Sequence, residues 1–264
     1  MVPPVLCYHR VGGPAELGVT RISPATFRRQ MHALARAGWR TLTLDQFAAS
    51  VQDGQSAIRY PQSAFLLTFD DGYTELAEHA YPVVQEVGFT ATTFLITDYV
   101  GKTNAWDIQY TRQPLRHLDW ETVEAWQGRG FDFSSHTATH TRLTWSDDAR
   151  VADELGRSRE TLTRRLGRTA GDAVAYPFGA VDERVARAAN AAGYTLGFDG
   201  VAGVEGDRFR LSRIPVYVWD AANVPFGLRD DELGILGRIV AYVANRCAVG
   251  TTIMQTLFGR DASA

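Results

Sequence analysis

The sequence predicts an α/β fold in which parallel strands alternate with helices around a single barrel. A helix-like stretch that ends in Gly, followed by an aromatic residue and a strand-like run, occurs four times, at Gly38–Trp39, Gly88–Phe89, Gly130–Phe131 and Gly193–Tyr194. Gly after a helix adopts the left-handed conformation without strain, so each copy marks a helix end and a new strand. About seven or eight such units without a linker predict one (β/α) barrel, possibly with fewer than eight strands.

An open doubly wound sheet is the alternative architecture for this alternation of elements. No G-x-G-x-x-G follows any predicted strand, so a dinucleotide-binding fold has no support. The predicted strands lie near residues 4–9, 40–44, 64–70, 90–96, 131–135, 173–177, 194–198 and 211–218. The predicted helices lie near residues 24–37, 45–52, 74–87, 119–128, 147–166, 181–192 and 229–246.

Local signals define several of these helices. Asp119 and Ser146 are the predicted N-caps of the helices that begin near 119 and 147. Pro82 lies inside the 74–87 pattern and should kink or break it. We assign residues 1–264 to one domain, with 224–264 as a C-terminal helical extension.

Composition and charge exclude several classes of protein. A hydrophobic content of 45% and a net charge of −3 are ordinary for a globular chain and give no reason to expect nucleic-acid binding. No apolar run is long enough to span a membrane, and no signal peptide precedes the first strand, so a cytoplasmic location is expected unless an export signal has been removed. Cys7 and Cys247 are too few for a disulfide framework and are expected to be small buried side chains.

Chemistry-bearing side chains gather where the predicted strands end. Asp70 and Asp71 follow the strand near 64–70, and His136 and His140 follow the strand near 131–135. Each pair alone has an ordinary explanation, a solvated turn for the acids and surface or core residues for the histidines. Together, one carboxylate and two imidazoles form a familiar ligand set for a catalytic metal, and the second acid remains available to take a proton from water.

Other strand ends supply further candidates. Strand alternation places His9 last on one face of its strand, where it could donate a proton, or simply be held by local hydrogen bonds. In "AYPFG" the Phe178 amide could point at a developing oxyanion, or the motif could be a plain turn. Aromatic residues are the candidates for contact with substrate, by stacking or at the predicted mouth: Tyr73, Trp106, Tyr110, Trp145 and Tyr176.

The chain resembles the polysaccharide deacetylase (NodB-homology) family, carbohydrate esterase family four. The resemblance covers residue 4 to about residue 218 and rests on five motifs in the expected order: "TFDDGY" (68–73), "SHTATH" (135–140), "AYPFG" (175–179), "AGY" (192–194) and "LSRIPV" (211–216). The start "CYHRVGG" is similar to the branch that deacetylates poly-β-1,6-N-acetylglucosamine. The resemblance implies a distorted (β/α)7 TIM-like barrel.

The resemblance also implies roles for individual residues. Asp70 would be the general base, and Asp71, His136 and His140 would be the metal ligands. His9 would be the general acid and the Phe178 amide an oxyanion donor.

Two departures from the family pattern concern the base and the acid. The Arg that many members place two residues before the Pro of "AYPFG" is Ala175 here, and we hypothesise that Arg213 supplies the guanidinium instead. The second departure is that no histidine follows residue 140. His9 is therefore the candidate acid, because His32, His79 and His117 lie away from predicted strand ends.

The predicted function is a metal-dependent hydrolase that removes N-acetyl groups from N-acetylglucosamine-containing poly- or oligosaccharide. Zn²⁺ is the expected metal, although a carboxylate with two imidazoles also accepts Co²⁺, Ni²⁺ or Fe²⁺. The alternatives are a deformylase or deacylase of another amino-sugar or lipid-linked substrate, a catalytically silent carbohydrate-binding relative, and a structural protein. The oligomeric state is left open.

Overall fold

The computed structural model describes residues 2–14, 19–52, 63–104, 114–167, 172–201, 203–218 and 220. Within these residues, eight parallel strands form one curled sheet with the order β10-β1-β5-β6-β7-β8-β9, and β4 pairs with the start of β5. The strands of this sheet are β1 (Val5–Tyr8), β4 (Arg40–Thr41), β5 (Ala64–Phe69), β6 (Thr92–Leu95), β7 (Asp132–Ser135), β8 (Ala173–Ala175), β9 (Leu196–Phe198) and β10 (Ile214–Pro215). The sheet forms a half-barrel, which confirms the distorted barrel over the open doubly wound alternative.

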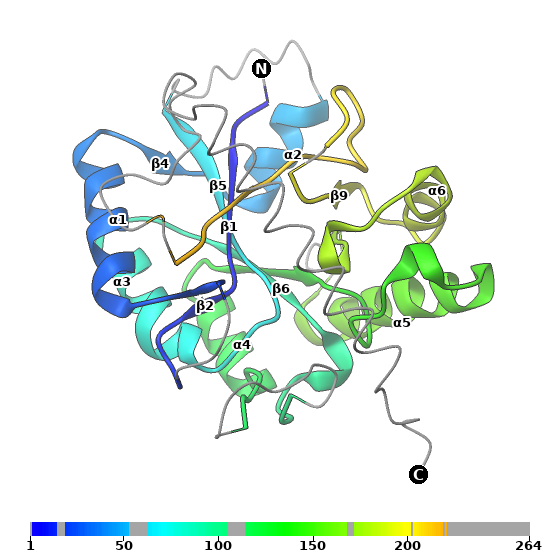
Figure 1. Ribbon diagram of the computed structural model, residues 1–264, viewed down its shortest axis with the longest axis horizontal. Coiled ribbons are helices and arrows are strands. Elements are labelled where there is room, and N and C mark those ends of the chain that lie inside the picture. The colour runs from blue at the N-terminus through cyan, green and yellow to red at the C-terminus, as the bar shows by residue number, and fades with distance from the viewer. Residues whose placement is uncertain are drawn as a thin grey trace.

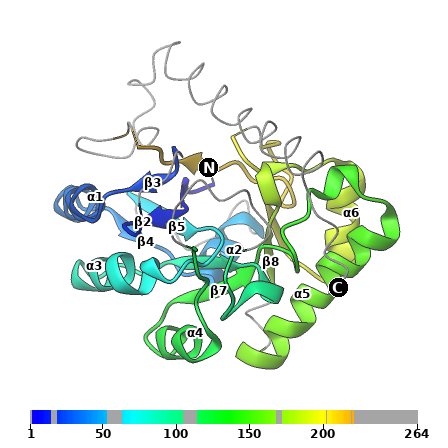
Figure 2. The same ribbon diagram turned by 60° about the horizontal axis from the view of Figure 1, so that its bottom comes forward.

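Helices connect successive strands and lie on the outside of the sheet. In Figure 1, α1 and α3 lie on the left, α5 and α6 on the right and α4 below, and Figure 2 shows them in an arc around the curled sheet. The helices are α1 (Pro24–Arg36), α2 (Leu44–Gln52), α3 (Tyr81–Glu86), α4 (Trp120–Gln127), α5 (Asp148–Leu166) and α6 (Glu183–Ala191). Short helical turns are η1 (Leu76–Ala80), η2 (Thr97–Tyr99), η3 (Leu143–Trp145) and η5 (Pro177–Gly179), and a small second sheet pairs β2 (Arg10–Val11) with β3 (Arg21–Ile22).

The core explains why the central strands read as unbroken apolar runs. All six residues of β5 are buried, since one face of the strand packs under the helices and the other faces the barrel interior. Phe65, Leu67 and Phe69 belong to a cluster with α1, α3 and α4, whereas Leu66 packs with Phe94 and Phe198 inside the curl. Burial on both faces fixes the register of the strand, and therefore the position of the residues that follow it.

Most of the local predictions are confirmed. Gly38, Gly88, Gly130 and Gly193 all have positive φ, from 73° to 92°. The Asp119 side chain accepts a hydrogen bond from the Thr122 amide and caps α4. The 74–87 segment is divided at Pro82, because a π-helical turn ends at Ala80 and α3 begins at Tyr81.

Two local predictions need correction, and others fall outside the described residues. Asp147, not Ser146, caps α5, because the Asp147 carboxylate accepts from the Arg150 amide. The last strand is reduced to Ile214–Pro215, although the Val216 amide still donates to the Cys7 carbonyl oxygen at 2.9 Å. The predicted helix 229–246, Cys247 and the 224–264 extension lie beyond the described part of the chain.

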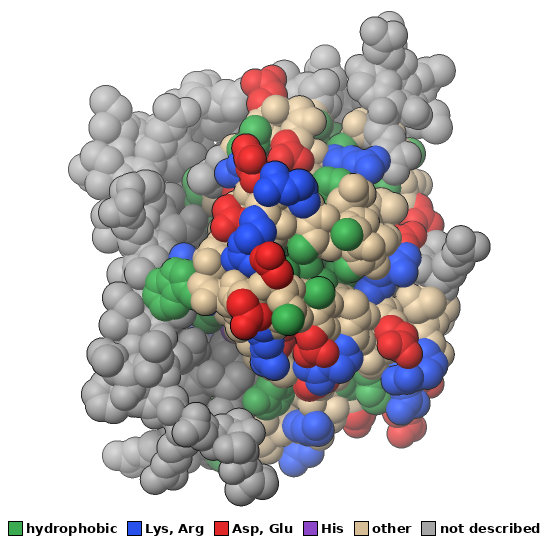
Figure 3. Space-filling model, turned by 90° about the vertical axis from the view of Figure 1, so that its right-hand side faces the viewer, with side chains coloured by type: hydrophobic (Ala, Val, Ile, Leu, Met, Phe, Trp, Pro, Cys, Tyr) green, Lys and Arg blue, Asp and Glu red, His purple; other side chains and the backbone are tan. Residues whose placement is uncertain are grey.

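The surface over α5 and α6 mixes charges of both signs. Figure 3 shows acidic and basic side chains interspersed on the face at the right of Figure 1. Ion pairs on or between these two helices join Arg184 to Asp148 and Arg187 to Glu183. Among the described residues, no helix is both long enough and apolar enough to cross a bilayer.

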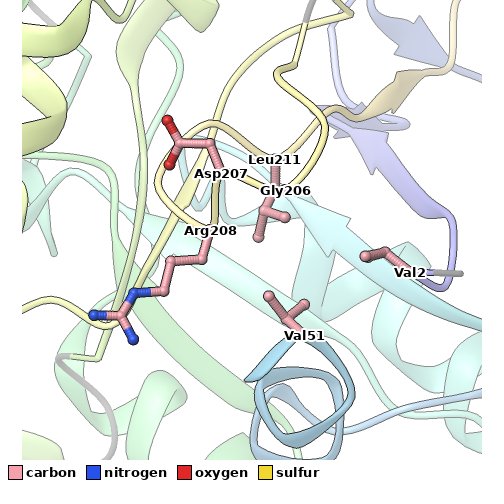
Figure 4. A pocket seen from close by; sticks show the side chains of 6 residues that line it. All are labelled: Val2, Val51, Gly206, Asp207, Arg208 and Leu211. Atoms are coloured by element: carbon pink, nitrogen blue, oxygen red, sulfur yellow. The ribbon is translucent and has the colours of Figure 1, made fainter. Parts of the chain in front are cut away.

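A pocket of about 320 Å³ lies at the amino-terminal end of the sheet (Figure 4). Val2 precedes β1, Val51 lies near the end of α2, and Leu211 lies beside β9, so apolar side chains form much of the lining. In barrels of this kind the chemistry gathers at the opposite, carboxyl-terminal end of the strands. The candidate site is therefore expected at that end.

Candidate functional site

The carboxyl-terminal ends of four neighbouring strands bring the predicted residues together. His9 follows β1, Asp70 and Asp71 follow β5, His136 follows β7, and Phe178 lies on the turn after β8. These strands are adjacent in the sheet or separated by one strand, so residues far apart in the sequence meet at one edge. Residues from separate strand ends therefore form one site.

Asp71, His136 and His140 present three ligand atoms to one point. Asp71 Oδ1 lies 3.4 Å from His136 Nε2 and 3.5 Å from His140 Nε2, and all three side chains are buried. Tetrahedral ligand atoms at bond lengths of about 2.1 Å lie roughly 3.4 Å apart. The separations therefore fit a divalent metal ion bound by the three residues.

The hydrogen bonding of His136 supports the same conclusion. Its Nδ1 lies 2.7 Å from the Ala175 carbonyl oxygen, which can only accept, so Nδ1 carries the proton. Burial lowers the pKa of His136 to about 4, so the imidazole is neutral at physiological pH and Nε2 offers a bare lone pair. This lone pair faces the Asp71 carboxylate, another acceptor. Two acceptors that face each other at 3.4 Å are suited to binding a cation between them.

Backbone strain is concentrated at this site. Four residues other than Gly have positive φ in the described chain: Asp71 (67°), Thr137 (66°), His140 (62°) and Phe178 (62°). A side chain in the left-handed region costs free energy, of order 1–3 kcal/mol, and persists only where the surroundings enforce it. Three of the four are predicted site residues, and the fourth lies between the two histidines.

Asp70 has a different environment from its neighbour. Arg213 Nη1 donates to Asp70 Oδ1 at 2.7 Å, and Arg213 Nε donates to the Asp199 carbonyl at 2.9 Å. Burial alone would raise the pKa of Asp70, but Arg213, with His136 and His9, brings that pKa below its ordinary value. Asp70 is therefore ionised, with one oxygen held by Arg213 and the other facing the site.

The Arg213 contact matches the hypothesis that this residue replaces the Arg missing at Ala175. The Arg213 guanidinium is buried, lies 5.9 Å from the Phe94 ring and reaches Asp70 from the chain just before β10. Replacing Arg213 by Ala is expected to lower kcat/KM by about 10–100-fold. The acid limb of the pH–rate profile should also move to higher pH, because the pKa of Asp70 rises when the cation is removed.

Arg213→Lys tests the same idea with less disturbance. Removing one partner of a buried pair can destabilise a fold by about 3–5 kcal/mol, whereas Lys retains the charge. Arg208→Ala, an exposed arginine in the same segment, is the control. Turnover and pH profile that stay at the control's values in both Arg213 variants would contradict the assignment.

His9 and Cys7 form the other wall around Asp70. His9 Nε2 and Cys7 Sγ lie 3.9 Å and 3.6 Å from Asp70 Oδ2, and the His9 side chain remains 28% exposed. Burial lowers the pKa of His9, against the opposing effect of Asp70, and burial raises the pKa of the Cys7 thiol. His9 is thus a partly exposed imidazole beside Asp70, which can act as an acid or a base. Cys7 is a protonated thiol.

A row of rings leads from the histidines to the surface. The Phe178 ring lies 4.7 Å from the His140 ring, and the Arg142 guanidinium lies 5.8 Å from Phe178 and 4.9 Å from the Trp145 ring. Trp145 is 54% exposed. It is therefore an exposed aromatic surface beside the site.

His117 is a site residue that the sequence argument missed. Its Nδ1 donates to the Asp71 carbonyl oxygen at 2.8 Å, and burial lowers its pKa to about 4. The His117 and Tyr73 rings stack with centroids 4.9 Å apart, and Tyr73 OH accepts from Asn104. His117 fixes the backbone of a predicted ligand residue. Its position far along an irregular segment gave no periodic signal.

Two predicted substrate contacts are corrected. Tyr73 is nearly buried and packs against His117, with the Arg10 guanidinium 5.6 Å from its ring. Tyr176 is fully buried in the cluster around α5 and α6. Neither offers a ring to substrate, because strand-end aromatics here fill the core. Trp106 and Tyr110 lie outside the described residues.

Comparison with known proteins identifies the family. The poly-beta-1,6-N-acetyl-D-glucosamine N-deacetylase of Staphylococcus epidermidis is 24% identical in an alignment of length 235 that covers 80% of this chain and 78% of that protein. The fold is shared with the Streptococcus pyogenes deacetylase PplD (TM-score 0.71, 21% identity, 81% of this chain and 92% of that one). It is also shared with IcaB from Ammonifex degensii (TM-score 0.66, 22% identity, 92% and 96%). The sequence model of the polysaccharide deacetylase family matches residues 57–197, more than half of the chain, and the protein therefore belongs to that family.

Proposed function

We propose that the protein is a metal-dependent N-deacetylase that hydrolyses the acetamido groups of N-acetylglucosamine-containing poly- or oligosaccharide. Membership of the polysaccharide deacetylase family and the similarity to the Staphylococcus epidermidis enzyme support the substrate class. The observation that carries the proposal is the pair of acids, with Asp71 facing two histidines and Asp70 facing Arg213 and His9. His136 Nε2 also lies 3.9 Å from Asp70 Oδ2, but the shortest contacts of the two acids go to different residues, so the acids can perform separate tasks.

Asp71, His136 and His140 would hold the metal, and we propose Zn²⁺, which this ligand set favours along with Co²⁺, Ni²⁺ and Fe²⁺. When bound, the metal supplies Lewis acidity, which polarises a carbonyl group and makes a nearby water more acidic. Asp70 Oδ2 lies 3.9 Å from both His136 Nε2 and His9 Nε2, so Asp70 and His9 would be the groups beside the bound ion.

The remaining residues move protons and hold the reacting groups. Asp70 accepts a proton from the water that attacks the amide carbon, while Arg213 keeps the carboxylate ionised and oriented. The Phe178 amide donates a hydrogen bond to the oxyanion. Protonated His9 would donate a proton to the departing amine as the C–N bond breaks; burial lowers the pKa of His9, so its imidazolium is a stronger acid but a smaller fraction of His9 carries that proton at neutral pH. The products are acetate and the free amino sugar.

Release of acetate from N-acetylated oligosaccharides tests the function directly. The purified protein should release acetate from β-1,6-linked N-acetylglucosamine oligomers, lose this activity in chelator, and regain it with Zn²⁺ or Co²⁺. Formylated and longer-chain acylated amino sugars, assayed in parallel, distinguish deacetylation from other deacylations. Binding of glycan without release of any acyl group, in metal-loaded protein, would contradict the proposal.

Trp145 provides a prediction about chain length. Because its exposed ring lies beyond Phe178 and Arg142 from the histidines, we expect it to stack on a sugar that flanks the reacting one. Trp145→Ala should raise KM for longer oligomers about two- to tenfold, with a smaller change in kcat. Trp145→Phe should retain most of the affinity. An equal effect on short and long substrates would contradict a flanking subsite.

A further inference from the structure

The segment that joins the two histidine ligands is held by a buried carboxylate from α5. Glu154 is 0% exposed. Its Oε2 accepts from the backbone amides of Ala138 at 2.9 Å and Thr139 at 2.8 Å. Its Oε1 accepts from the Thr139 hydroxyl and from Arg150, 2.7 Å away. The carboxylate thus binds the middle of the His136–His140 segment from outside the ligand set.

The same segment contains two of the strained residues. Thr137 and His140 have positive φ, and the two amides bound by Glu154 lie between them. Strain of this kind persists only where other contacts over-determine the backbone. Two adjacent amides bound to one charged oxygen are a direct constraint, because charge-assisted hydrogen bonds are the stronger ones.

Other contacts hold the far side of the segment but do not replace Glu154. The Thr137 and Ala138 carbonyls accept from the Thr97 and Asp98 amides, which follow β6. These bonds fix the carbonyls, and Glu154 fixes the amides on the other edge of the same backbone. The segment is therefore held between β6 and α5.

Burying the Glu154 carboxylate costs free energy, which a residue with only a packing role would not require. α5 buries Val151, Leu155 and Leu162 against the sheet, and Glu154 lies on this buried face. A carboxylate there must be fully satisfied by partners to be tolerated. In the described chain its hydrogen-bond donors come from the histidine segment, from Thr141 directly after it, and from Arg150 one helical turn earlier.

We propose that Glu154 is a positioning residue that fixes the strained segment between His136 and His140, and thereby sets the affinity of this site for its divalent metal. The carboxylate does not touch the metal position. It acts through the backbone of Ala138 and Thr139, which determines where His140 points relative to His136 and Asp71. Outer contacts that orient ligands typically contribute 10–100-fold to metal affinity.

The test measures metal affinity in the absence of substrate. Glu154→Ala should weaken Zn²⁺ binding by about 10–100-fold, measured by competition with a chromophoric chelator. Glu154→Gln should lie between the wild type and Ala, since its carbonyl oxygen can still accept from the amides without the charge. The visible spectrum of the Co²⁺-loaded protein should change in both variants, because the arrangement of the ligands changes. Saturating metal should restore much of the lost activity.

Two controls separate positioning from general stability. Glu160→Gln alters an exposed acid on the same helix and should retain wild-type metal affinity. Leu162→Ala destabilises α5 through the hydrophobic core, about two helical turns beyond Glu154. If Glu154→Ala does not fold, Glu154→Gln decides, through its Zn²⁺ affinity and hydrogen exchange at the Ala138 and Thr139 amides.

The outcomes are distinct from those of the proposed function. The proposal would be overturned if a folded Glu154 variant bound Zn²⁺ within about twofold of the Glu160→Gln control. It would also be overturned if the loss of Zn²⁺ affinity were no larger than that of Leu162→Ala at equal thermal stability. Lack of activity on every acylated sugar would instead reject the deacetylase function. It would leave the metal-binding result unaffected.

Discussion

Replacing Asp70 by Asn is expected to reduce turnover by about 10²–10⁴-fold while the protein still binds its metal. Asn matches Asp in shape but cannot take a proton from water, and Asp70 is not among the three residues whose ligand atoms converge. Acetate release and metal content, measured on the same preparation, check the two halves of this expectation. Thermal unfolding shows whether loss of the Arg213 contact also destabilises the fold.

The neighbouring acid provides the matched comparison for this variant. Asp71→Asn should lose metal as well as activity, because Asp71 Oδ1 faces both histidine nitrogens. Asp45→Asn, the same change at an exposed helix position, should behave as wild type. Normal deacetylation by Asp70→Asn, or equal loss of metal from both variants, would show that the two acids do not have separate roles.

Replacing His136 by Ala is expected to remove metal binding and with it all metal-dependent activity. Outer contacts typically contribute 10–100-fold to affinity, and loss of one of three ligands should exceed that range. His136 is also oriented by the Ala175 carbonyl, which fixes the direction in which its Nε2 points. Zn²⁺ affinity by chelator competition and acetate release check the prediction.

The control for His136 is a histidine outside the site. His32 is partly exposed on α1 and pairs with Glu86, so His32→Ala should leave metal content unchanged. A His136→Ala protein that binds Zn²⁺ as tightly as His32→Ala would place the metal elsewhere. Partial rescue of His136→Ala activity by added imidazole would further support direct ligation.

Local signals were sufficient for the scaffold. The four helix-ending glycines, the apolar run of β5 and the Asp119 cap depend on interactions within a few residues or on simple periodicity, and the structure confirms each. The N-cap of α5 was misplaced by one residue, because Ser146 and Asp147 are both good caps and only the backbone path selects between them. Such errors shift a helix boundary without altering the fold.

Site residues that depend on long-range contacts were harder to predict. His117 was set aside because it follows no strand, yet its ring reaches the Asp71 carbonyl across 46 residues of sequence. Tyr176 was expected to contact substrate but is a core side chain. Glu154 did leave a signal, an acid on the apolar face of a helical pattern with Val151 and Leu155, which in a soluble protein calls for a buried partner.

The sequence by itself determined the order of strands and helices, the acids and histidines that follow strand ends, and the resemblance to a deacetylase family. Periodicity, capping and motif order are local properties, and the sequence contains them directly. Only the tertiary structure decided that Asp71 lies nearest His136 and His140, while Asp70 is held by Arg213 and has both His9 and His136 at 3.9 Å from its other oxygen. The reason is physical: the two acids are adjacent in the chain, and their separation depends on a positive φ at Asp71 and on partners from other strands.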